Sequence, residues 1–189
     1  MAYKYCLWRS ALGFVFAALI GSAGAQAQGY QVLPWPARHP IPAFTATDLS
    51  GRAWRLSDLR GKAVLINFWA SWCEPCRAEM PSLQALAQQQ GPEPLQVLAV
   101  NFKEPAATVQ RFVQQNSLQL PVILDLEGVT ARQWGIKVFP STVLVAADGR
   151  VRSIVRGELD WTSAQATQLL ASLQATAPAP ARKAATQQR

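Results

Sequence analysis

A short apolar segment that ends just before two closely spaced cysteines constrains the fold of this 189-residue chain more than any other feature. Residues 63–69 read Ala-Val-Leu-Ile-Asn-Phe-Trp, which is typical of a strand buried on both faces of a parallel sheet. Cys73 and Cys76 follow, and the residues from about Glu74 to Gln90 have the spacing of an amphipathic helix. The sequence therefore predicts a buried strand that delivers two cysteines to the start of a helix.

The remainder of residues 43–174 alternates between predicted strands and helices in the order β-β, β-α-β-α-β-α, β-β-α. This alternation predicts an α/β fold in which helices cover both faces of a central sheet. The strand order in that sheet does not follow from the pattern. The predicted strands are 44–48, 53–55, 63–69, 95–101, 121–125, 142–146 and 150–156, and the predicted helices are 74–90, 106–115, 128–134 and 161–173.

The two ends of the chain have different compositions from the predicted domain. Residues 1–27 are interpreted as a signal peptide, because basic residues precede a short apolar stretch and Ala25-Gln26-Ala27 suits a signal peptidase. The alternative is an uncleaved membrane anchor, although the apolar stretch is shorter than the ~20 residues that span a bilayer. Both interpretations place the domain outside the cytoplasm. Residues 28–42 contain four prolines and predict an extended lead-in, and residues 175–189 predict a disordered tail.

Charge and cysteine content exclude several classes of protein. The formal net charge is +7, but the basic residues are scattered along the chain, which argues against a nucleic-acid-binding surface. Of the three cysteines, Cys6 lies in the N-terminal segment, so the domain keeps only Cys73 and Cys76. Two cysteines are too few for a disulfide scaffold, so we interpret them as a local redox device.

The helix N-terminus explains how these two thiols are expected to react. Its unpaired N–H groups and partial positive charge favour a thiolate, and such settings lower a cysteine pKa from about 8.5 to about 7 or below. Cys73, at the helix tip, gains most and is the expected nucleophile. Cys76 lies one turn deeper and is expected to resolve the mixed disulfide that Cys73 forms.

Other uses of two cysteines fit less well. Zinc needs about four ligands, and the only histidine, His39, lies in the proline-rich lead-in. Covalent haem attachment needs histidine after the second cysteine, where Arg77 stands. A structural disulfide that encloses two residues restrains little of the chain. Copper bound by two thiolates stays open as an alternative, although no third ligand is evident.

Several motifs together resemble the TlpA/ResA/CcmG branch of the thioredoxin superfamily. Residues 72–76 read Trp-Cys-Glu-Pro-Cys, similar to the superfamily's Trp-Cys-x-Pro-Cys active site. Residues 139–142 read Phe-Pro-Ser-Thr and resemble its cis-proline loop. Residues 49–62 resemble the branch's N-terminal hairpin, and Glu79 and Pro81 match positions that follow its active-site motif.

This resemblance implies a thioredoxin fold whose central mixed sheet is flanked by helices, with an N-terminal β-hairpin extension and an inserted helix-strand unit. It also implies a periplasmic thiol–disulfide reductase that needs no cofactor or metal. Typical substrates are apocytochrome c, its maturation partners, or copper-site assembly factors of respiratory oxidases. Electrons usually come from a membrane protein of the DsbD/CcdA type.

The resemblance further assigns roles around the expected Cys73–Cys76 redox disulfide. Thioredoxin has a buried aspartate where this chain has Asn67, which cannot take up a proton at neutral pH. Glu79 is the candidate replacement that helps to deprotonate Cys76, as in ResA-like proteins. Pro140, in the cis form, is expected to lie against the disulfide and present backbone to a substrate.

Four neighbouring residues are expected to bind substrate or tune the thiols. Trp72 and Phe139 flank the motif and the proline loop, and Glu74 and Pro75 lie between the cysteines. A carboxylate at Glu74 disfavours the Cys73 thiolate, which should lower the reduction potential and favour a reductant.

Three other functions could use the same fold or the same cysteine pair. A disulfide oxidase or isomerase stays open, although strong oxidants often carry histidine between the cysteines. A peroxidase of the peroxiredoxin type is disfavoured, because Ala70 and Ile66 replace its threonine or serine and its proline. A copper-binding metallochaperone that uses the same cysteine pair also stays open.

Overall fold

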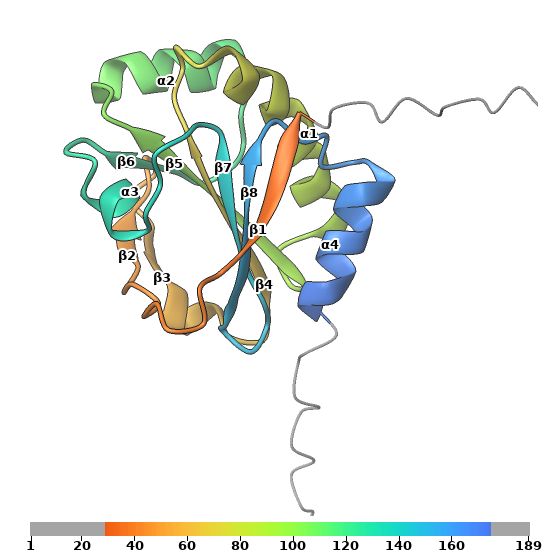
Figure 1. Ribbon diagram of the computed structural model, residues 1–189. Helices are drawn as coiled ribbons and strands as arrows, with labels where there is room; N and C mark the ends of the chain where they lie inside the picture. The colour runs from red at the N-terminus through yellow and green to blue at the C-terminus, as the bar shows by residue number, and fades with distance from the viewer. Residues whose placement is uncertain (1–28, 175–189) are drawn as a thin grey trace, which may run out of the picture.

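The computed structural model describes residues 29–174, so the predicted signal peptide, Cys6 and the predicted C-terminal tail lie outside the described residues. A six-stranded sheet runs through the centre of the molecule in the order β1-β8-β7-β4-β5-β6, with helices on both faces (Figure 1). Strands β4, β5 and β6 are parallel, whereas β7, β8 and β1 run antiparallel to their neighbours. The sheet strands are β1 (Tyr30–Pro34), β4 (Ala63–Trp69), β5 (Leu95–Phe102), β6 (Val122–Asp125), β7 (Ser141–Val145) and β8 (Val151–Gly157).

The smaller elements fill the two layers beside this sheet. Strands β2 and β3 pair as a separate antiparallel hairpin, which corresponds to the predicted N-terminal extension. Helix α2 and strand β6 form the predicted inserted helix-strand unit. These elements are β2 (Thr45–Thr47), β3 (Ala53–Arg55), the 3-10 helix η1 (Leu56–Leu59), α1 (Glu74–Gln90), α2 (Ala106–Gln115), α3 (Val129–Gln133) and α4 (Ala164–Gln174).

The central strand β4 separates two hydrophobic cores because its side chains alternate between the faces of the sheet. Leu65 and Trp69 belong to the core under α1, α2 and α4. Ile66 and Phe68 belong to the core under the hairpin, η1 and α3. Asn67 lies between Leu65 and Trp69 in this period-two pattern and therefore points toward α1. The one polar residue of the strand is thus placed under the helix that carries the cysteines.

The N-terminal lead-in contains a strand that the sequence analysis did not predict. Strand β1 pairs with β8 over its whole length, from Tyr30 opposite Gly157 to Pro34 opposite Ser153. Pro34 at the end of an edge strand is compatible with this pairing, because edge strands tolerate proline. Gly157 has φ +94°, and a β-carbon on it would collide with the Gly29 carbonyl oxygen. Close approach of two backbones therefore requires glycine at this position.

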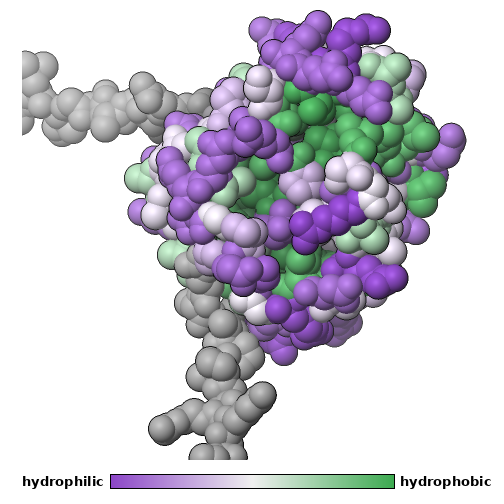
Figure 2. All heavy atoms as spheres, turned by 180° about the vertical axis from the view of Figure 1, so that it is seen from behind, coloured by the Kyte–Doolittle hydropathy of each residue, from purple (hydrophilic) through white to green (hydrophobic). Residues whose placement is uncertain are grey.

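Seen from behind, hydrophobic surface is gathered in an area bordered by hydrophilic side chains (Figure 2).

Within residues 29–174, no helix has the length and apolar composition needed to cross a membrane. The predicted final helix begins at Ala164 and not at Trp161, because residues 161–163 form a turn whose last residue, Ser163, accepts the Ala166 backbone N–H through its hydroxyl at 3.2 Å, as an N-cap does.

Candidate active site

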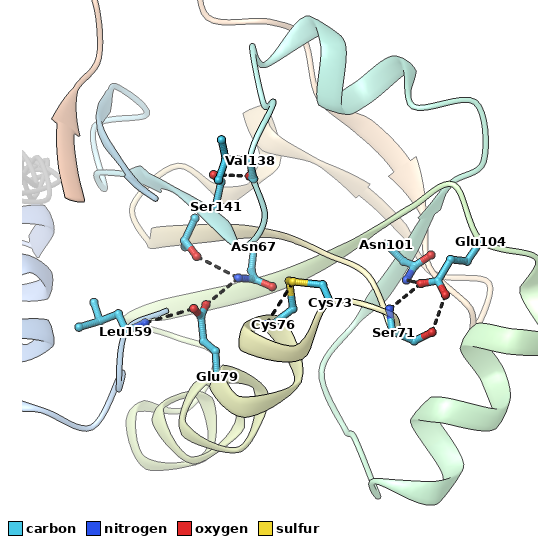
Figure 3. Close-up of a disulfide and its surroundings, with 11 residues drawn as sticks. Asn67, Ser71, Cys73, Cys76, Glu79, Asn101, Glu104, Val138, Ser141 and Leu159 are labelled. Carbon is cyan, nitrogen blue, oxygen red and sulfur yellow. Dashed lines mark hydrogen bonds between the residues drawn. A yellow bond between two sulfur atoms is a disulfide. The ribbon is translucent and has the colours of Figure 1, made fainter. Parts of the chain in front are cut away.

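The two cysteines lie where the sequence predicted them, at the start of α1. Cys73 is the N-cap residue of the helix, and its sulfur accepts a hydrogen bond from the Cys76 backbone N–H at 3.3 Å. The two sulfurs form a disulfide with an S–S distance of 2.09 Å (Figure 3). Cys73 keeps 6% of its surface exposed, whereas Cys76 has none. A reactant that approaches from solvent therefore meets Cys73 first.

Glu79 lies one turn beyond Cys76 and points into the protein, toward Asn67 (Figure 3). Only 2% of its surface is exposed. The Asn67 side-chain amide donates to Oε1 at 2.8 Å, and the Trp161 indole N–H donates to the same oxygen at 3.0 Å. The Leu159 backbone N–H donates to Oε2 at 3.3 Å. Residues of β4, α1 and the segment after β8 thus converge on this one carboxyl group.

Burial determines how Glu79 titrates. Desolvation raises the pKa of Glu79 from 4.5 to about 7, and the charge of nearby Glu158 adds to this increase. Hydrogen bonds from Trp161 and Leu159 favour the ionised form but do not outweigh the loss of solvation. A carboxyl group with a pKa near neutrality can both accept and release a proton under physiological conditions.

Pro140 lies immediately before β7, and the Phe139–Pro140 peptide bond is cis, as the resemblance implied. The Pro140 carbonyl accepts a hydrogen bond from the Gly157 N–H at 2.9 Å. The Ser141 hydroxyl donates to the Val138 carbonyl at 2.7 Å (Figure 3). These bonds tie the loop to β8 and to its own preceding turn.

Two aromatic rings connect the cysteine motif with the proline loop. The Trp72 ring contacts the Phe139 ring edge-on, with centroids 6.2 Å apart, and Phe139 lies 4.7 Å from Phe102. Trp72 is 63% exposed, which makes it a prominent apolar side chain beside the disulfide. Glu74 and Pro75, in the first turn of α1, are also exposed.

A second buried carboxylate near the cysteines was missed by the sequence analysis. Glu104 follows β5, is 6% exposed, and hydrogen bonds Ser71 in the loop before Cys73. One signal could have found it, because polar residues that directly follow neighbouring parallel strands meet at the same sheet edge. This signal depends on strands 63–69 and 95–101 being neighbours, which the pattern of elements does not establish.

Metal ligands are not gathered anywhere in the part of the chain that the structure describes. No group of three or more His, Cys, Asp or Glu side chains in residues 29–174 is placed to hold a metal ion. The arrangement that is present, a disulfide at a helix tip above a buried carboxyl group, suits exchange between thiols and disulfides. Fold and site together define a thiol–disulfide oxidoreductase with a thioredoxin fold.

Comparison with known proteins gives the family. Residues 37–154 match the AhpC/TSA family. The thiol–disulfide oxidoreductase ResA of Geobacillus thermodenitrificans is 39% identical over 121 residues, which cover 62% of this chain and 68% of that relative. The chain therefore belongs to the AhpC/TSA family and, within it, to the ResA-like thiol–disulfide oxidoreductases of the thioredoxin superfamily.

Solved structures agree with this placement. A thioredoxin-like protein from Neisseria meningitidis has a TM-score of 0.65 at 31% identity and covers 71% of this chain and 89% of its own. A DsbE-like thiol:disulfide interchange protein from Chlorobium tepidum has a TM-score of 0.61 at 29% identity, with coverage of 70% and 94%. Both support the thioredoxin-like architecture described above.

Proposed function

We propose that this protein is an extracytoplasmic protein-disulfide reductase. Cys73 is the nucleophile, Cys76 is the resolving thiol, and Glu79 moves the proton that Cys76 must lose. The observation that carries this proposal is the buried Glu79, whose pKa is raised by desolvation to about 7, on the helix that holds both cysteines. A proton acceptor with this pKa matches a thiol that must be deprotonated only briefly.

The first step is attack by the Cys73 thiolate on a disulfide in the substrate protein. A bond forms between Cys73 Sγ and one substrate sulfur, the substrate disulfide breaks, and the second substrate sulfur leaves as a thiolate and takes up a proton. The N-terminal end of α1 stabilises the attacking thiolate through its free N–H groups and dipole. The Cys76 N–H that points at Cys73 Sγ, at 3.3 Å, is one such donor.

The second step releases the substrate. Cys76 gives its proton to the Glu79 carboxylate and attacks Cys73 Sγ, which expels the first substrate sulfur as a thiolate and closes the Cys73–Cys76 disulfide. Two electrons have then moved to the substrate, and protonated Glu79 is deprotonated again when its proton passes to the expelled substrate thiolate. A second dithiol protein must reduce Cys73–Cys76 before the next cycle.

The surface around Cys73 suits a protein substrate. The Pro140 loop lies before strand β7, and the exposed Trp72 with Phe139 offers an apolar contact for residues that flank the substrate cysteine. Glu74 and Pro75 lie between the two cysteines and tune the reduction potential of the pair. In this role Glu74 disfavours the Cys73 thiolate and makes the protein a better reductant.

The ResA-like family suggests the pathway. We infer substrates among apocytochrome c, its maturation partners, or copper-site assembly factors, and a membrane donor of the DsbD/CcdA type. A signal peptide in residues 1–27 would deliver the protein to the periplasm, and an uncleaved segment would anchor it to the periplasmic face of the inner membrane. Thiol exchange of this kind needs no cofactor.

Trapping in cells tests the proposal. Cys76→Ser leaves Cys73 able to attack but unable to release its substrate, so mixed disulfides accumulate and can be identified. The matched control is Cys73→Ser, which should trap far less because the nucleophilic thiol is gone. Captured apocytochrome c or copper-assembly factors would support the reductase. Capture mainly of a DsbB-like oxidase would reverse the direction, and tight copper binding without exchange activity would favour a metallochaperone.

A further inference from the structure

Glu104 is a buried carboxylate that links strand β5 to the loop before Cys73 through hydrogen bonds. It is only 6% exposed and accepts from the Ser71 N–H at 2.7 Å and from the Ser71 hydroxyl. The Asn101 side-chain amide donates to Oε2 at 2.7 Å. The side chains of Ser71, Asn101 and Glu104 therefore form a compact cluster beside the disulfide (Figure 3).

The sheet explains why these residues meet. Strands β4 and β5 are parallel and in register at their carboxyl ends, where Trp69 pairs with Asn101. Ser71 and Glu104 each lie two residues beyond the end of these strands and so lie at the same edge. Parallel neighbours present the segments that follow them side by side at one edge of a sheet.

Helix α2 does not use the Glu104 side chain, although Glu104 stands two residues before the helix. The N-cap residue of α2 is Pro105, and no side chain caps the helix. An acidic residue before a helix often accepts from its first N–H groups. The Glu104 side chain instead accepts hydrogen bonds from Ser71. We take this to indicate that the side chain holds the loop before Cys73 and does not cap α2.

Ser71 is part of the short loop that connects β4 with Cys73. Within this loop, the Cys73 N–H donates to the Ala70 carbonyl at 3.2 Å. In the described part of the chain, the hydrogen bonds that tie Ser71 to another segment are those to Glu104. The loop that places Cys73 is thus fastened to the sheet through one carboxylate.

We propose that Glu104 is a positioning residue for the redox reaction: by holding Ser71, it fixes Cys73 at the distance from Cys76 that disulfide closure requires. This inference rests on the proposed function, since it concerns the same dithiol. Fixing two reacting groups in place raises the effective concentration of one at the other. Loss of Glu104 therefore weakens the Cys73–Cys76 disulfide relative to the dithiol.

The test is the equilibrium with glutathione, in which the protein disulfide and two glutathione thiols exchange for the protein dithiol and glutathione disulfide. Glu104→Ala should shift this equilibrium at least fivefold toward the dithiol. Glu104→Gln keeps one side-chain oxygen that can accept a hydrogen bond from Ser71. On a logarithmic scale, its shift of the equilibrium constant should therefore be at most half of the shift caused by Glu104→Ala. Ser71→Ala, which keeps its N–H, should give a smaller shift in the same direction.

Asp125→Asn is the matched control. Asp125 is also 6% exposed, and its side chain accepts the backbone N–H groups of Thr130 and Ala131 at the start of α3 instead of groups in the cysteine loop. The Asp125→Asn substitution should lower the free energy of unfolding but change the glutathione equilibrium constant less than twofold. Glu104→Gln and Ser71→Ala keep the test valid if Glu104→Ala does not fold.

A shift below twofold in Glu104→Ala, or one no larger than in Asp125→Asn, would overturn the inference. If Glu104→Ala does not fold, the overturning result is a Ser71→Ala equilibrium that is no further toward the dithiol than that of Asp125→Asn. The glutathione equilibrium requires only a reactive cysteine pair, so it can be measured whatever the direction of the reaction in cells. Failure of the trapping experiment and failure of this one are therefore distinguishable.

Discussion

The buried Glu79 gives a quantitative prediction for the pH dependence of folding. In the unfolded chain its pKa is 4.5, and burial raises the pKa to about 7 in the folded protein. Below about pH 4.5 the group is protonated in both states and costs the fold nothing. Between about pH 4.5 and about 7 the carboxyl group ionises in the unfolded chain but stays protonated in the folded protein, so this part of the stability is lost as the pH rises, and the loss is complete above about 7.

The difference between 4.5 and about 7, at 1.36 kcal/mol per pH unit, corresponds to about 3 kcal/mol of unfolding free energy. Glu79→Gln has nearly the same shape and cannot ionise, so it escapes this loss. The unfolding free energy of the variant minus that of the wild type should therefore increase by about 3 kcal/mol between pH 4 and pH 8.

Urea unfolding of both oxidised proteins, followed by tryptophan fluorescence at several pH values, measures this difference directly. Comparing two proteins at the same pH cancels the titration of groups that do not interact with Glu79. Glu127→Gln, which removes an exposed carboxylate, corrects for the loss of one charge. A difference that stays constant within about 0.5 kcal/mol, or that falls as the pH rises, would refute the reasoning about Glu79.

Three further variants test other parts of the site and fold. Glu74→His should raise the reduction potential measured against glutathione, because it removes a charge that disfavours the Cys73 thiolate, and an unchanged or lower potential would contradict this role. Trp72→Ala should change the unfolding free energy by less than about 1 kcal/mol but slow the reduction of protein disulfides more than that of small ones; equal slowing would argue against substrate contact. Asp48→Ala should cost about 2–4 kcal/mol in thermal unfolding, since Asp48 accepts from Ser50, Arg52 and Trp54, and a loss below about 0.5 kcal/mol would show that the hairpin turn holds without it.

Local sequence was sufficient for the strand and helix that hold the cysteines. The run of apolar residues before Cys73 predicted β4 (Ala63–Trp69), and helical spacing with Pro75 in the first turn predicted α1 (Glu74–Gln90) at the observed bounds. These elements are specified by side chains close together in the chain. For the same reason, the cysteine pair and its position at the helix tip could be predicted.

Contacts between distant segments could not be predicted in this way. The environment of Glu79 depends on Trp161, which is 82 residues away, and on a main-chain N–H after β8. Pairing of β1 with β8 likewise joins opposite ends of the domain, in a stretch whose prolines predicted no regular structure. The contact between Glu104 and Ser71 required knowledge that β4 and β5 are neighbours, which the pattern of elements did not provide.

Replacing Gly157, at the end of β8, is expected to change how the protein behaves at high concentration. Any larger residue at Gly157 would push β1 away, and β8 would then become the outermost strand, with its main-chain donors and acceptors unused. Bare strands of this kind recruit strands from other molecules. Self-association would then be the first defect to appear, ahead of any change in the chemistry at the cysteines.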